Sequence, residues 1–120
     1  MNPSRSSLDR NLKVTLHHDV PIAGIEMLKV AWAAVNRVTT SGKLLGPDER
    51  ITPFEALRAI TDDAAWQNFE EDRKGTLEKG KLADMVILSD DPLSVDPMAI
   101  KDIRIVQTIK EGVTVYSAKV

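Results

Sequence analysis

Both histidines of the chain lie beside a carboxylate, in the stretch LHHDVP at residues 16–21. Because side chains alternate between the two faces of a strand, we expect His17 and Asp19 to share one face and His18 to take the other. A His-x-Asp pair at a strand end can offer a nitrogen and an oxygen to one metal ion or one proton-transfer path. The same residues before a proline can also close a strand without binding anything. The spacing alone leaves both interpretations open.

The other polar clusters do not complete a catalytic site. A catalytic zinc ion takes three protein ligands, and adjacent residues of one strand cannot all face it. The carboxylates at residues 70–72 are typical of a solvated helix end, and Asp90 and Asp91 are typical of a turn. Residues 75–82 resemble a phosphate-binding loop, but Leu82 stands where that loop needs a hydroxyl group. The residues by themselves therefore indicate an incomplete site.

The composition excludes several classes of protein. The chain has 120 residues, enough for one domain, and its 42% hydrophobic and 28% charged residues are typical of a globular protein. A formal charge of -2 leaves no broad cationic surface for a nucleic-acid backbone. The sequence has no cysteine, which excludes disulfides and thiolate metal sites, and no apolar run of signal-peptide or bilayer-spanning length. We expect a soluble, cytoplasmic chain that binds neither nucleic acid nor a membrane.

The first half of the sequence predicts a strand followed by a helix. Residues 1–12 are polar and are expected to form a mobile lead-in, and residues 13–17 are predicted to form a short strand. After Pro21 an amphipathic helix is expected from about Gly24, ending near residues 39–42. The apolar residues at helical spacing are Ile25, Leu28, Trp32 and Val35.

A capping box marks the start of the next helix. Thr52 can accept a hydrogen bond from the amide of Glu55, Glu55 can reach back to the amide of Thr52, and Pro53 suits the first helical position. Thr61 is predicted to cap a second short helix over residues 62–69. The side chains expected to be buried by the first of these helices are Phe54, Leu57 and Ile60.

From Gly75 onwards the apolar pattern changes to that of strands. The continuous apolar run in residues 83–88 predicts a strand buried on both faces. Residues 103–109 and 113–116, separated by Glu111 and Gly112, predict a hairpin. The order of one strand, helices and a small antiparallel sheet indicates an α+β fold or a piece of something larger.

Several ordered motifs together resemble the C-terminal end of metal-dependent amidohydrolases. The resemblance is strongest to the YtcJ-like branch, some of whose members are named exoenzyme regulatory proteins, and it extends from about Lys13 to Tyr116. The motifs are HxDxP at 17–21, AVNR at 34–37, ITxxEALRAxT at 51–61, KGTLEKGKLAD at 74–84 and DPL at 91–93.

The resemblance implies a fold and a site. In that family a TIM-type barrel carries the chemistry at the C-terminal ends of its strands, and both chain ends build a β-sandwich. Residues 13–72 would then be the last barrel strand with its helices, and residues 73–120 a portion of the sandwich. Asp19 would stand in the place of the carboxylate that contacts the metal centre and handles protons for the attacking water. His17 would look into the pocket as a further candidate ligand, and His18 has no assigned role.

The resemblance also implies that the site is incomplete. The family's early His-x-His, its central metal-bridging residue and its later histidine ligands lie on strands that this sequence does not contain. A divalent metal, zinc first, and a small-molecule amide or cyclic carbon-nitrogen substrate are therefore expected of a parent enzyme. The chain alone is expected not to be a competent hydrolase, and to need the missing N-terminal barrel segment. The alternative is a freestanding interaction or regulatory module that forms homo-oligomers through open sheet edges.

Overall fold

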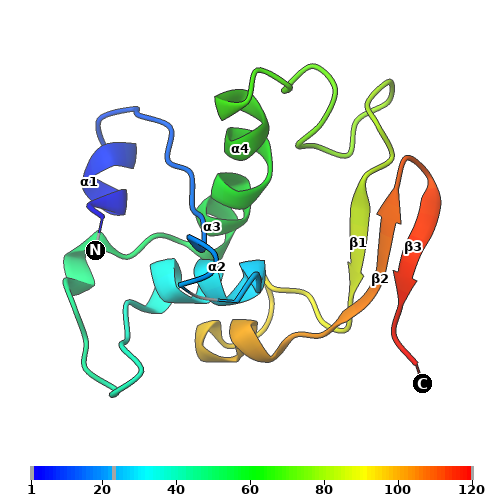
Figure 1. Cartoon of the computed structure of the whole chain (residues 1–120). Coiled ribbons are helices and arrows are strands. Elements are labelled where there is room, and N and C mark those ends of the chain that lie inside the picture. Colours follow the sequence, from blue (N-terminus) through cyan, green and yellow to red (C-terminus); the bar gives the residue numbers. More distant parts are fainter. Residues whose placement is uncertain (1, 23, 120) are drawn as a thin grey trace.

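The structure is a computed structural model that describes residues 2–22 and 24–119. It contains helices and one small antiparallel sheet, which confirms the predicted α+β class. In Figure 1 the helices lie on one side and the sheet on the other, joined by the long loop after α4 and by the segment between β1 and β2. The elements are α1 (Ser4–Leu8), α2 (Met27–Asn36), the 3₁₀ helix η1 (Pro47–Glu49), α3 (Pro53–Ile60), α4 (Asp62–Gln67), β1 (Met85–Leu88), the 3₁₀ helix η2 (Pro97–Asp102), β2 (Ile105–Lys110) and β3 (Val113–Ser117).

The described part of the predicted lead-in, residues 2–12, contains a short helix with contacts to distant parts of the chain. Ser4–Leu8 form α1, and Ser4 is buried. Arg5 donates from Nη1 to both carboxylate oxygens of Glu55 at 2.8 and 2.9 Å, and the amide of Ser6 donates to Glu49 at 3.0 Å. The partners lie more than forty positions away along the chain. A polar segment is therefore ordered here by distant carboxylates that its own composition cannot reveal.

The predicted strand at residues 13–17 is also wrong. This segment has no regular secondary structure, and its backbone is tied to the helices by a hydrogen bond of 3.3 Å from the amide of Leu16 to the carbonyl of Ala59. A strand exists only when a neighbouring strand pairs with it. In residues 2–22 and 24–119, the pairing is confined to β1–β3 and one isolated bridge between Val38 and Leu44. The β-branched sequence thus lacks the neighbour that its pattern anticipates.

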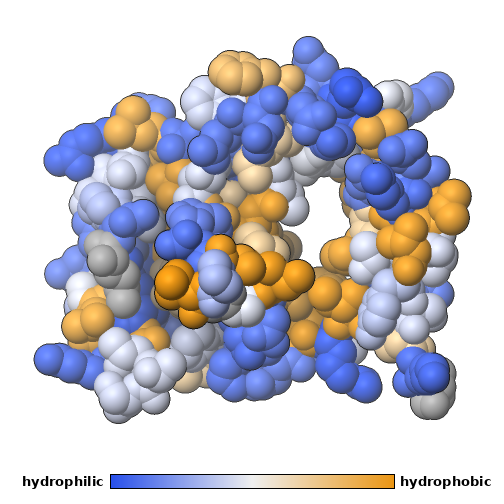
Figure 2. All heavy atoms as spheres, in the orientation of Figure 1, coloured by the Kyte–Doolittle hydropathy of each residue, from blue (hydrophilic) through white to orange (hydrophobic). Residues whose placement is uncertain are grey.

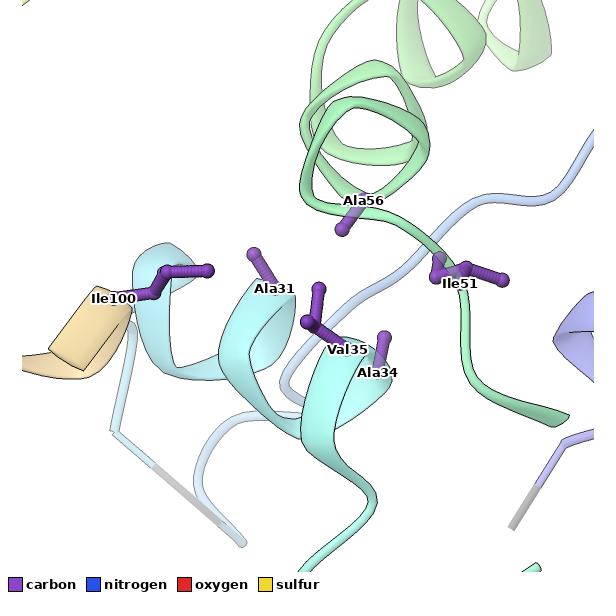
Figure 3. Close-up of a cluster of buried hydrophobic side chains, with 6 residues drawn as sticks. All are labelled: Ala31, Ala34, Val35, Ile51, Ala56 and Ile100. Atoms are coloured by element: carbon purple, nitrogen blue, oxygen red, sulfur yellow. The ribbon is translucent and has the colours of Figure 1, made fainter. Parts of the chain in front are cut away.

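The predicted helix after Pro21 is confirmed as α2, and two of its four buried residues are alanines. It ends at Asn36, because Arg37 takes a left-handed conformation with φ of 54°. Ile25, predicted to lie on the helix, precedes it and is 78% exposed. Small side chains of α2 and α3 pack together in a hydrophobic cluster, which is drawn in Figure 3. The cluster contains Ala31, Ala34, Val35, Ile51, Ala56 and Ile100.

The capping box at the start of α3 is confirmed. The Thr52 hydroxyl accepts from the amide of Glu55 at 3.2 Å, and the Glu55 carboxylate accepts from the amide of Thr52 at 2.8 Å. The predicted burial of Phe54 is wrong, because its side chain is 58% exposed while Ala56 and Ala59 face the core.

The prediction that Thr61 caps α4 is wrong as well. Its hydroxyl donates to the carbonyl of Leu57 at 2.8 Å, back into α3, and makes no cap bond to α4. The second helix nevertheless forms directly after it, and it ends at Gln67 instead of residue 69. The carbonyl one turn earlier is therefore a competing acceptor for this hydroxyl group.

The C-terminal hairpin is confirmed. β2 pairs antiparallel with β3, from Lys110 opposite Val113 to Gln107 opposite Ser117, and β1 pairs with the other side of β2. The turn between them has positive φ at Glu111 and Gly112, as a tight hairpin turn requires. The sheet order is thus β1-β2-β3.

The sheet is far less buried than the apolar sequence of residues 83–88 predicts. The side chains of Val86 and Ile87, which point to opposite faces, are 51% and 45% exposed. Figure 2 shows an open gap between the helices and the sheet, with hydrophobic side chains along its edge. The sequence identifies a strand that is apolar on both faces, but the described residues provide no layer that covers it.

Two hollows lie between the helices and the sheet. One, of about 710 Å³, lies between the start of α2 and β2–β3, and the other, of about 550 Å³, lies between α4 and β1. None of the helices among the described residues has the length and hydropathy needed to cross a bilayer.

Candidate functional site

Asp19 and His17 lie in the segment that leads into α2, and both are exposed. Asp19 has a φ of 56°, in the left-handed region, and its carbonyl accepts from the amide of Ile22 at 2.9 Å. Aspartate is among the few residues other than glycine that adopt this conformation readily. The expectation that His17 and Asp19 share a face depended on a strand, and that strand is not formed. Their roles as candidate site residues remain predictions.

Leu16 fixes the N-terminal side of this turn. Its side chain packs against the core cluster, and its amide is the one that donates to Ala59 at the end of α3. The exposed pair His17 and Asp19 therefore follows directly after a residue that is held by the helical core.

His18, the residue directly before Asp19, connects this segment to the start of α2. Its Nε2 lies 2.6 Å from the carbonyl oxygen of Glu26, the residue that precedes α2. The carboxylate of Glu26 pairs with Lys29 in the first turn of α2 at 2.5 Å. Two tethers, one to α3 and one to α2, thus hold the segment directly before Asp19.

The described residues do not assemble a metal site by themselves. Within residues 2–22 and 24–119, no group of three or more His, Asp or Glu side chains is placed to hold a metal ion. Glu70 pairs with Lys74 at 2.9 Å, within a local charge pair at the end of the helical region. The donors that this chain can offer near Asp19 do not reach the three that a catalytic zinc ion takes.

Asp91 forms the turn that the sequence predicts. Its carboxylate accepts from the hydroxyl of Ser94 at 2.7 Å and from the amide of Leu93 at 2.9 Å. These hydrogen bonds, the Ser94 hydroxyl first, lower the pKa of Asp91. The carboxylate is therefore occupied in holding the loop after β1.

Sequence reasoning assigned no role to Asn36 and Arg37, which are buried at the end of α2. Arg37 donates from Nε to the carbonyl of Leu45 at 2.9 Å and from Nη1 to that of Asn2 at 3.0 Å. Asn36 donates to the carbonyl of Pro97 at 2.8 Å. In the sequence, the signal for these backbone contacts is a pair of adjacent polar residues that directly follows the apolar face of a helix. They join the N-terminal segment, the η1 loop and η2 around the helix that follows Asp19.

The comparisons with known proteins identify a family. Residues 1–116 match the family described as the amidohydrolase family. The chain is 33% identical to the N-substituted formamide deformylase of Arthrobacter pascens over 95% of its own length, and 29% identical to the YtcJ protein of Bacillus subtilis (strain 168) over 82%. It is 40% identical over 71% of its length to the protein LONG AFTER FAR-RED 3 of Arabidopsis thaliana.

The matches cover most of this chain but a small part of each relative. The chain spans 21%, 19% and 15% of the length of these three proteins. Among solved structures, an amidohydrolase from Thermotoga maritima MSB8 superposes with a TM-score of 0.67 at 20% identity, over 97% of this chain and 26% of that one. This superposition shows a shared fold over the matched part. The chain therefore belongs to the amidohydrolase family, and it corresponds to a segment of the relatives it matches.

Proposed function

We propose that this chain is the C-terminal part of a metal-dependent hydrolase that cleaves non-peptide carbon-nitrogen bonds, and that it is not a competent enzyme alone. In this proposal residues 13–72 supply the end of a TIM-type barrel and residues 73–120 supply part of a composite β-sandwich. The observation that carries the proposal is the sheet, whose apolar side chains are exposed on both faces.

A sheet of this kind needs a covering layer. Burying apolar surface contributes roughly 25 cal/mol per Å², and a small sheet is stable when a hydrophobic face packs on another layer. The side chains of Val113, Val115 and Tyr116 in β3 are 65%, 61% and 50% exposed. Large continuous apolar surfaces on a protein are typical of interfaces. A further polypeptide segment that packs on this sheet supplies the missing layer, and the coverage of the relatives fits a longer protein.

Asp19 is the residue through which this chain would contribute to the chemistry. A carboxylate at this position would face the metal centre of the assembled enzyme and exchange protons with the attacking water, and His17 would be a neighbouring ligand candidate. The divalent metal, zinc first, would polarise the substrate carbonyl and the water when bound. The donors in the described part of the chain do not hold such an ion unaided, so the other ligands would come from the remaining polypeptide.

The substrate class follows from the family and one relative. The Arthrobacter pascens relative is named N-substituted formamide deformylase. We propose a small-molecule amide or cyclic carbon-nitrogen substrate for the assembled enzyme, which we place in the cytoplasm.

Zinc titration by calorimetry tests the proposal. The isolated chain is expected to show no stoichiometric tight binding and no hydrolysis of amide substrates. The genomic sequence directly upstream is expected to encode, in frame, a barrel segment with a His-x-His motif. Tight binding of zinc by the chain alone, or amide hydrolysis without a partner, would contradict the claim that the site is incomplete.

A second candidate function is an interaction module that self-associates. The observation in its favour is β3, an edge strand that is exposed along its whole length from Val113 to Ser117 and carries no charged residue. Such an edge can pair with a strand of another copy. Light scattering over a wide range of concentration separates the two candidates. A concentration-dependent dimer supports the module, and a monomer at all concentrations excludes edge-mediated association.

A further inference from the structure

We propose that His18 is a positioning residue that sets the conformation of the Asp19 turn. This inference deepens the proposed function, because it assigns a role to a residue next to the candidate catalytic carboxylate. The contact that carries it is the hydrogen bond of 2.6 Å between Nε2 of His18 and the carbonyl of Glu26. It joins the residue immediately before Asp19 to the residue immediately before α2.

The chemistry of the contact fixes the state of the imidazole ring. A backbone carbonyl can only accept, so Nε2 must carry the proton and donate it. A protonated ring nitrogen has no lone pair to give to a metal ion. While this contact is made, His18 cannot be a ligand through Nε2. Its ring is therefore engaged in holding the backbone.

The surrounding geometry shows what the contact holds. Asp19 has a φ of 56° and is the first residue of a turn with Val20 and Pro21 at its centre, which closes with the hydrogen bond from the amide of Ile22 to the carbonyl of Asp19. Leu16 fixes the segment before Asp19 to the helical core. The His18 contact reaches across the turn and joins the residue before Asp19 to the residue before α2. The backbone conformation that presents the exposed Asp19 side chain thus depends on the contact of the neighbouring His18 side chain with Glu26.

The tether can be tested by NMR on the full 120-residue chain without any metal. Residues with positive φ give a strong nuclear Overhauser effect between their own amide and α protons, because these protons lie close together. In His18→Ala we expect this signal of Asp19 to weaken, and the amide exchange of Ile22 to accelerate roughly fivefold, the size typical of one neutral hydrogen bond. In His18→Gln both should stay near their original values, because the Gln side-chain amide can donate to the same carbonyl.

Glu26→Gln is the matched control. It removes the carboxylate that pairs with Lys29 but keeps the backbone carbonyl that accepts from His18, so neither signal of the turn should change. The amide spectrum of the β2–β3 hairpin reports whether each variant is folded. An unchanged Asp19 signal in His18→Ala, or equal losses in His18→Ala and His18→Gln, would overturn the proposal.

A measurement on the unsubstituted chain tests the hydrogen bond between His18 and Glu26 even if a variant does not fold. The imidazole ¹⁵N spectrum distinguishes the two neutral tautomers, and we expect His18 to be the one protonated at Nε2. A His18 ring protonated at Nδ1 would show that Nε2 does not donate to the carbonyl of Glu26, and would overturn the proposal. These results are separate from the zinc titration, because tight zinc binding there would contradict the claim that the site is incomplete and would leave the geometry of the turn untouched.

Discussion

At the scale of single residues, the structure relies on close backbone approaches and long-range charge pairs. Gly75 illustrates the first, because a Cβ added there would lie 2.8 Å from the Cβ of Ala65 and 3.0 Å from the Cα of Asp62. Its φ of 92° is also one that residues with a side chain rarely adopt. Glu55 illustrates the second, since it joins α1 to the start of α3.

Gly75→Ala should therefore destabilise the chain by about 2–4 kcal/mol, the sum of a strained φ and an overpacked contact. The free energy of unfolding in urea measures this. Gly80→Ala is the matched control, because Gly80 has a similar φ of 98° but open space around its Cα. It should cost only the conformational part, about 1–2 kcal/mol. Equal losses in the two variants would show that the loop does not pack on α4.

The acid sensitivity of the fold should depend partly on Glu55. Burial raises the pKa of this carboxyl group, but hydrogen bonds from Thr52 and Arg5 outweigh burial and bring the pKa below its ordinary value of 4.5. A lowered pKa in the folded state stabilises the fold above about pH 4.5, and this stabilisation is lost as the pH falls through the folded value.

Urea unfolding at neutral pH and near pH 3 should therefore show a smaller pH-dependent loss in Glu55→Gln than in the original chain. Part of the loss should remain, because Glu49, Glu78 and Asp91 also have lowered pKa values. An identical loss in the two chains would show that Glu55 is not paired in the folded state.

At the scale of elements, local signals define the start of a helix where the sequence itself contains both partners of the cap. The capping box of α3 meets this condition, since Thr52 and Glu55 are three residues apart. Thr61 has a competing acceptor one turn earlier, and its hydroxyl bonds to Leu57. Threonine thus caps a helix at position 52 and donates back into the preceding helix at position 61. The difference depends on which backbone donor or acceptor lies within reach of the hydroxyl group.

Thr52→Ala should lower the free energy of unfolding by about 1 kcal/mol, the usual cost of losing an N-cap. Thr61→Ala is the control and should cost at most a few tenths of a kcal/mol, because its exposed hydroxyl caps no helix and back-bonding of this kind adds little. Chemical denaturation of both variants gives the comparison. A larger loss for Thr61→Ala than for Thr52→Ala would contradict the assignment of the two caps.

At the scale of the whole molecule, the hydrophobic core lies almost entirely among the helices and η2. The cluster of Figure 3 joins α2, α3 and η2. The tie to η2 is reinforced by Trp32, whose indole donates to the carbonyl of Met98 at 3.0 Å. The sheet adds little to that cluster, and its apolar side chains border the gap seen in Figure 2. The two parts of the chain should therefore respond differently to the same substitution.

Val86→Thr and Val35→Thr test this difference, because both replace a methyl group by a hydroxyl group of similar size. Val86 is 51% exposed and its substitution should change the free energy of unfolding by less than about 0.5 kcal/mol. Val35 is 7% exposed, and a hydroxyl buried there should cost about 1–3 kcal/mol. Binding of the dye anilinonaphthalene sulfonate should fall in Val86→Thr. Equal costs for the two variants would mean that the sheet face is covered in solution, as in a self-associated form.

The sequence by itself determined the features whose causes are local. It predicted the capping box at Thr52, the helix α2, the β2–β3 hairpin around Glu111 and Gly112, and the family, because each depends on residues close together or on ordered motifs. These signals need no knowledge of what lies on the other side of the molecule. The α+β class followed from the order of the elements.

The tertiary structure decided everything that depends on a distant partner. It paired Arg5 with Glu55 and so ordered the N-terminal residues as a helix, and it left residues 13–17 without the neighbouring strand that a β-branched segment needs. It also exposed the strand at Val86, because a sequence can mark a face as apolar but cannot supply the layer that buries it. The turn at Asp19 belongs to the same class. Its shape is held by His18 through the carbonyl of Glu26, a contact that only the fold brings together.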